Sequence, residues 1–147
     1  MCSSLAARVK FSCSAKTANS RTASVHVLPD LVGRFDGRVW LVSKCGERVQ
    51  QRTLAWLDHH HFYDRTGIPR DHVRFCRARP EKADHCAELA ITDFIDDRVD
   101  VMAALRSVVD RRYLFGPQRK PVPADVIATP TWSAVAEAVR TAASLLG

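Results

Sequence analysis

The sequence predicts a single α/β domain, a three-layer Rossmann-like fold with a mainly parallel sheet. First, short apolar runs alternate with amphipathic helical stretches from about Leu31 onward, which is typical of a parallel sheet covered on both faces. Second, 147 residues at 46% hydrophobic and 26% charged are enough for one domain with a sizeable core. Third, no apolar run approaches the roughly 18–20 residues of a membrane span, so we expect no membrane partner.

The first half of this pattern contains two strands and two helices. The apolar run Val39-Trp40-Leu41-Val42-Ser43 predicts a buried strand. Residues 47–59 carry apolar side chains on one side and predict a helix. Gly67-Ile68-Pro69 interrupts the chain, residues 73–76 alternate like a strand, and residues 81–89 follow as a helix opened by a proline.

The second half repeats the alternation. Phe94-Ile95 predicts a short buried strand that ends in two acidic residues. Residues 101–109 have the spacing of an amphipathic helix, and residues 113–115 form a further strand closed by Gly-Pro. A proline-rich loop leads to the last helix, for which Thr129 is the expected N-cap and Pro130 the first helical residue.

The N-terminal segment, residues 1–29, differs in composition from residues 30–147. It carries +4 of the formal net charge of +6, holds six serines and has no acidic residue. Three interpretations stay open: a flexible tail, an altered or wrongly started beginning of a domain, or a targeting peptide. Arg8–Cys13 and Ser24–Leu28 are each candidates for a short strand.

Five cysteines at irregular positions, with no C-x-x-C, do not resemble a disulfide framework. We interpret them as reduced thiols of a cytoplasmic protein. The remaining 118 residues carry only +2, so the basic pI does not by itself indicate nucleic-acid binding, and we do not expect a nucleic-acid partner.

Polar residues follow two of the predicted strands. Ser43 ends one strand, and Asp96-Asp97 follow another. Because the carboxyl ends of parallel strands meet at one edge of the sheet, a hydroxyl and two carboxylates are expected to lie along that edge, where α/β proteins bind their ligands.

The order of three features resembles the haloacid-dehalogenase-like (HAD) hydrolase superfamily. They are a strand ending in Ser43 (VWLVSK), Lys82 at the start of a helix (RPEKADHCAEL), and a strand running into paired acids (ITDFIDDRVDV). They match the second, third and fourth motifs of the family and span about residues 39–115. The resemblance implies a HAD-type domain over residues 30–147. No inserted cap domain is expected, because only one helix and one strand separate Ser43 from Lys82.

The resemblance also implies roles. Ser43 would donate a hydrogen bond to a phosphoryl oxygen, and Lys82, as a catalytic and phosphate-binding residue, would neutralise the phosphate and carboxylates. Asp96 and Asp97 would hold Mg²⁺, a cation that prefers carboxylate oxygens. The implied activity is Mg²⁺-dependent hydrolysis of a small phosphomonoester.

The first motif of the family, a strand ending in D-x-D with the nucleophile and the general acid/base, is missing. The only acidic residues before Ser43 are Asp30 and Asp36, and neither belongs to such a pattern. If residues 9–14 were the first strand, Ser12 and Ser14 would stand at the two Asp positions. The first strand of this family is central in its sheet, so either residues 6–13 or residues 23–28 are expected to replace it.

These features predict a HAD-like hydrolase domain that is inactive or impaired without its nucleophile. The alternative is a non-catalytic protein that binds a phosphorylated ligand, a partner or nucleic acid.

Several other histidines, cysteines, acidic residues and arginines are not expected to form a functional site. The adjacent histidines 59–61 point in different directions along a helix end, and Cys76, His85 and Cys86 have no zinc spacing. Asp93 and Asp100 are expected to be surface or capping residues. A basic stretch is expected on a solvated strand and loop: Arg70, Arg74, Arg77 and Arg79.

Overall fold

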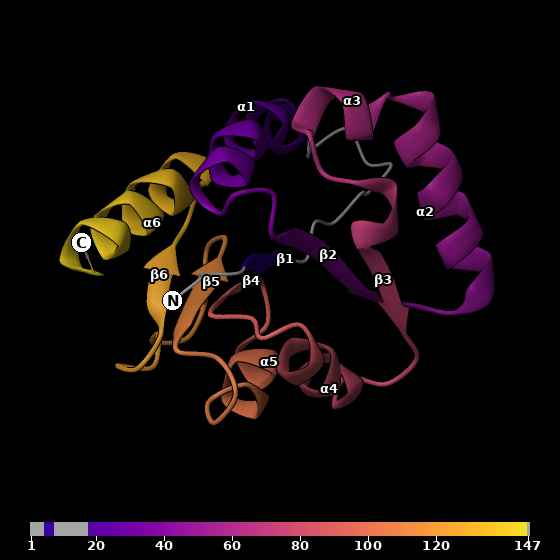
Figure 1. Ribbon diagram of the computed structural model, residues 1–147. Helices are drawn as coiled ribbons and strands as arrows, with labels where there is room; N and C mark the ends of the chain where they lie inside the picture. Colours follow the sequence, from indigo (N-terminus) through magenta and orange to yellow (C-terminus); the bar gives the residue numbers. More distant parts are fainter. Residues whose placement is uncertain (1–4, 8–17, 147) are drawn as a thin grey trace.

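The computed structural model describes residues 5–7 and 18–146, and its centre is one all-parallel sheet of six strands (Figure 1). The strand order is β3-β2-β1-β4-β5-β6. The strands are β1 (Leu5–Ala7), β2 (Val39–Lys44), β3 (Val73–Cys76), β4 (Asp93–Asp96), β5 (Arg111–Phe115) and β6 (Ile127–Thr129). The helices are α1 (Ala18–Arg34), α2 (Glu47–His59), α3 (Phe62–Thr66), α4 (Glu81–Glu88), α5 (Val99–Ala104) and α6 (Trp132–Leu146), with a short 3-10 helix at Arg70–His72.

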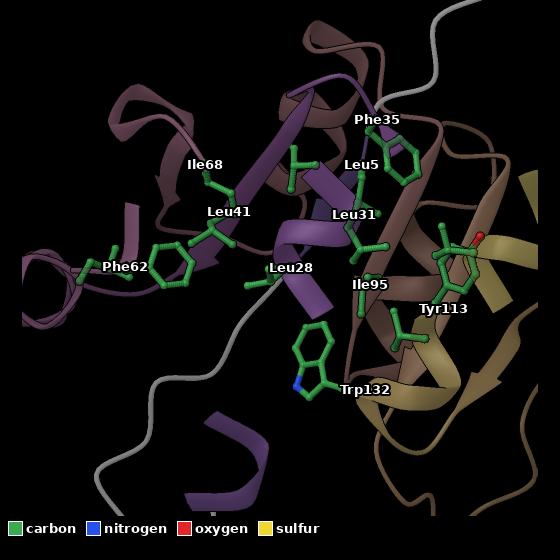
Figure 2. Packing of buried hydrophobic residues seen from close by; sticks show 14 residues of the cluster. Leu5, Leu28, Leu31, Phe35, Leu41, Phe62, Ile68, Ile95, Tyr113 and Trp132 are labelled. Carbon is green, nitrogen blue, oxygen red and sulfur yellow. The ribbon is translucent and has the colours of Figure 1, made fainter. Parts of the chain in front are cut away.

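Helices cover both faces of the sheet, which makes three layers and confirms the predicted α/β fold. Helices α1, α2, α3 and α6 pack on one face, and α4 and α5 on the other (Figure 1). Strand side chains alternate between the faces, so Leu41 joins the first cluster and its neighbour Val42 the second. Figure 2 shows the first cluster, in which Leu28 and Leu31 of α1 are fully buried.

Most elements after residue 38 agree with the prediction, including α2 at residues 47–59 and the absence of an inserted domain between β2 and α4. Helix α5 is shorter than expected: it begins at Val99 and ends at Ala104. Leu105 and Val109 are nevertheless buried in the turns that follow, so the apolar spacing continues beyond the helix. The chain must leave the helix there in order to enter β5.

The expected start of the last helix is wrong. Thr129 belongs to β6, where its hydroxyl donates to the carbonyl of Leu114 at 3.1 Å. The helix starts at Trp132, and the backbone N–H of Ala134 donates to the Thr131 hydroxyl at 3.1 Å. Thr131 therefore satisfies a free N–H group of the first turn, as an N-cap residue does.

The N-terminal segment contributes the centre of the sheet. Strand β1 lies between β2 and β4, with Ala7 opposite Leu41 on one side and Ile95 on the other. The expectation of a strand at Ser24–Leu28, or at residues 23–28, is wrong, because these residues lie in α1. A boundary at residue 29 would likewise cut through that helix. A strand at Arg8–Cys13, and the one at residues 9–14, lies outside the described residues.

The helical spacing that explains α1 is visible in hindsight. Leu28, Leu31 and Phe35 are buried and follow each other at i, i+3 and i+7, which places them on one side of a helix. Among the helices of residues 18–146, none is both long and apolar enough to span a membrane.

Candidate functional site at the carboxyl edge of the sheet

The polar ends of β2 and β4 flank the central strand. Ser43 lies two residues beyond Leu41, and Asp96 lies one residue beyond Ile95, where Leu41 and Ile95 are the two partners of Ala7. Between β1 and β4 the strand order changes direction, and such a switch point is where open α/β sheets form a crevice for ligands. The predicted edge site therefore has Ser43 on one side of β1 and Asp96 on the other.

Lys82 and Asp96 form a buried ion pair at this edge. The Lys82 ammonium Nζ lies 2.6 Å from Oδ2 of Asp96, and the two side chains are 1% and 0% exposed. The other carboxylate oxygen, Oδ1, accepts the backbone N–H of Arg98 at 3.1 Å. Lys82 also lies over the ring of Phe94, 5.9 Å from its centroid. A buried charge is stable only with compensating partners, and the ion pair supplies one to each of these two side chains.

Packing of α4 against β2 brings the segment with Ser43 next to the helix that carries Lys82. Helix α4, which carries Lys82, packs against β2, which carries Ser43, with Cys86 and Val42 in the same apolar cluster. Ser43 is half-buried, and its carbonyl accepts the thiol of Cys76 at 3.7 Å. Within the described part of the chain its hydroxyl has no hydrogen-bond partner.

The donor set for Mg²⁺ is incomplete in the described residues. Both oxygens of Asp96 are engaged, one by a cation, and Asp97 is only half-buried. In residues 5–7 and 18–146 no three His, Cys, Asp or Glu side chains form a group that could hold a metal ion. These residues do not fit a magnesium site on their own, and the role of Asp96 and Asp97 as ligands stays a prediction.

Asp93 is not the surface residue that the sequence suggested. It is 1% exposed at the amino end of β4, on the edge opposite the candidate site. Arg111 donates to both of its carboxylate oxygens at 2.7 and 2.8 Å, the Tyr113 hydroxyl donates at 2.9 Å, and the Thr92 hydroxyl at 2.6 Å. Burial, followed by the nearby negative charge of Asp93, raises the pKa of Tyr113. The network has a structural role, because it supplies hydrogen-bond donors to both oxygens of one buried carboxylate.

The four arginines of the basic stretch do not form one basic face. Each is bound to a different part of the protein. Arg70 pairs with Asp58, Arg74 with Glu88, Arg77 with the Cys45 carbonyl and the Gln50 side chain, and Arg79 with Asp100. Asp100 is exposed as predicted, and a hydrogen bond from Arg98 lowers its pKa. This distribution does not favour a nucleic-acid interface.

The histidines and cysteines considered in the sequence belong to no metal-binding group among the residues that the structure describes. His59 ends α2, His60 follows as its C-cap, and His61 adopts a left-handed backbone with φ of 52°, so the three do not converge. Cys76 and Cys86 are buried thiols, and burial raises the pKa of Cys86 to about 12. A thiol with this pKa is protonated at neutral pH and is a poor nucleophile.

Comparison with known proteins adds no family assignment: no protein-family model and no curated protein matches the chain. The site therefore depends on the ordered residues themselves. Sequence reasoning identified Ser43, Lys82 and Asp96, and the structure places all three at or beside one edge. It missed the backbone amide of Arg98, because a main-chain donor leaves no signal in the sequence. It treated Arg77 only as part of a basic stretch.

Proposed function

We propose that the chain is a HAD-like hydrolase domain that binds a phosphorylated ligand at the carboxyl edge but hydrolyses it poorly or not at all. One observation carries the proposal. The buried Lys82–Asp96 pair lies beside the end of β1, while residues 8–17, which follow β1 in the sequence, contain no Asp or Glu. This combination supports a phosphate site that lacks a carboxylate nucleophile.

Phosphate binding is supported by the chemistry of the groups at this edge. A hydroxyl donates one hydrogen bond and an ammonium donates three, and both suit phosphoryl oxygens. Within residues 5–7 and 18–146, Lys82 uses one donor on Asp96, and we expect its other donors to serve a ligand. The position of β1 between the strands that carry Ser43 and Asp96 agrees with the arrangement that the HAD resemblance implies.

Weak or absent hydrolysis is supported by the missing nucleophile. Loss of one member of a catalytic unit costs on the order of 10⁴–10⁶ in rate in well-studied hydrolases. Ser12 and Ser14, which would stand at the two Asp positions of the family, lie outside the described residues, and an unactivated serine hydroxyl is a weak nucleophile.

A phosphatase assay with a generic aryl phosphate and added Mg²⁺ tests the catalytic half of the proposal. We expect no turnover above the protein-free blank, with circular dichroism showing a folded protein. The matched variant is Asp96→Asn, which keeps the shape of the side chain. Mg²⁺-dependent turnover that disappears in Asp96→Asn would contradict the proposal and would mean that another carboxylate acts as nucleophile.

Titration with inorganic phosphate by calorimetry tests the binding half. Ser43→Ala removes one hydrogen bond to the ligand and should weaken binding by about 3- to 10-fold. Ser107→Ala, an exposed serine in the turn after α5, is the matched control and should bind like the wild type. A wild type that fails to bind phosphate, or a Ser43→Ala variant that binds equally well, would refute this part.

A further inference from the structure

Arg77 connects the two segments that present the candidate phosphate ligands. It is the first residue after β3 and lies at the carboxyl edge of the sheet. Its guanidinium donates from Nη1 to the carbonyl of Cys45 at 2.7 Å and from Nη2 to Oε1 of Gln50 at 2.9 Å. Its backbone N–H donates to Oε2 of Glu81 at 2.9 Å. One residue thus contacts the loop after Ser43 and the first residue of α4.

Among the residues that the structure describes, few other backbone hydrogen bonds hold the loop after Ser43. The pairing of β2 with β3 ends at Lys44, and one further backbone bond runs from the Cys45 N–H to the Cys76 carbonyl at 3.1 Å. Gly46 then leads into α2 with an extended backbone and without a side-chain cap. The guanidinium of Arg77 connects the Cys45 carbonyl to the first turn of α2. Its two donor nitrogens lie in one plane, so they fix the positions of both acceptors relative to each other.

The second contact acts on the segment that carries Lys82. Glu81 begins α4 immediately before Lys82, and its carboxylate is held by the backbone of Arg77. The N–H of Lys82 donates to the carbonyl of Arg79 at 3.0 Å, so the chain between β3 and α4 is a compact turn. The placement of the Lys82 ammonium on Asp96 therefore depends on this turn.

We infer that Arg77 is a positioning residue of the phosphate site. It acts through the loop after Ser43 and the start of α4, and its guanidinium is committed to Cys45 and Gln50. The inference rests on the proposed function. Arg77→Ala removes the side-chain hydrogen bonds to Cys45 and Gln50 and keeps the backbone hydrogen bond to Glu81, so the variant tests the route through the loop after Ser43. Loss of a charge-assisted hydrogen bond corresponds to about a tenfold change in affinity, so Arg77→Ala should weaken phosphate binding about tenfold.

The test is calorimetric titration of the full chain with inorganic phosphate in three variants. Arg79→Ala is the matched control, because it removes the same charge from the same turn but pairs with Asp100 on α5. It should bind phosphate like the wild type. Arg77→Lys keeps the charge but replaces the two donor nitrogens of the planar guanidinium with a single ammonium nitrogen, so it should fall between wild type and Arg77→Ala, with about a threefold loss. This graded rescue also serves if Arg77→Ala does not fold.

Amide hydrogen exchange gives a readout without ligand. Residues 45–50 should exchange faster in Arg77→Ala than in Arg79→Ala, while the core strands β4 and β5 stay equally protected. The inference about Arg77 is wrong if Arg77→Ala and Arg79→Ala bind phosphate with equal affinity. If the wild type still binds phosphate and Ser43→Ala still binds it more weakly, that result leaves the proposed function intact. Absence of phosphate binding by the wild type would overturn the proposed function and this inference with it.

Discussion

Replacing Lys82 by Met is expected to lower the free energy of unfolding by about 3–5 kcal/mol, because it removes one partner of a fully buried ion pair and leaves the Asp96 carboxylate less well compensated. Asp96 is 0% exposed, and its Oδ2 lies 2.6 Å from the Lys82 ammonium. Met has about the same length as Lys and matches the apolar part of its side chain. The loss of stability therefore reflects the missing charge more than altered packing. Urea unfolding followed by circular dichroism gives the measurement.

The control for Lys82→Met is Arg34→Met, which breaks an exposed i, i+4 pair with Asp30. Such pairs contribute about 0.3–0.5 kcal/mol, so this variant should remain close to the wild type. The double variant Lys82→Met with Asp96→Asn removes both charges and should recover part of the loss. A drop below about 1 kcal/mol in Lys82→Met would mean that Asp96 finds another partner or takes up a proton at little cost.

Replacing Asp93 by Ala is expected to lower the free energy of unfolding by about 3–4 kcal/mol, since the change removes the acceptor of one buried and two half-buried donor side chains. Arg111 loses two hydrogen bonds and the Tyr113 hydroxyl loses one, and Tyr113 is 0% exposed. Thermal and urea unfolding both measure the effect. An equal effect from Asp36→Asn, whose side chain is 81% exposed, would contradict the assignment.

The Asp93 variant also separates the two edges of the sheet. Asp93 begins β4 and Asp96 ends it, so the network of Asp93 is at the amino edge and the Lys82–Asp96 pair at the carboxyl edge. At a low temperature at which Asp93→Ala remains folded, the affinity of this variant for inorganic phosphate should equal that of the wild type. A loss of phosphate affinity would show that the network supports the site as well as the fold.

The sequence by itself determined most elements after residue 38, the faces that they bury and the edge on which Ser43 and Asp96 lie, but not α3, β6 or the start of α6. Each of these follows from local spacing. Leu41 and Val42 reach opposite faces because neighbouring strand residues alternate, and the end of a parallel strand defines its edge. The apolar residues of α2 repeat at the helical period.

The tertiary structure alone decided which elements meet. Leu5–Ala7 are three residues, too few for any periodic signal, and they become the central strand because β2 and β4 both need backbone partners. Lys82 and Asp96 are 14 residues apart, and Asp93 and Tyr113 are 20 apart, so no local pattern reports their contacts. Sequence spacing governs local conformation and burial, whereas the partner of a buried charge is selected only when the sheet brings distant segments together.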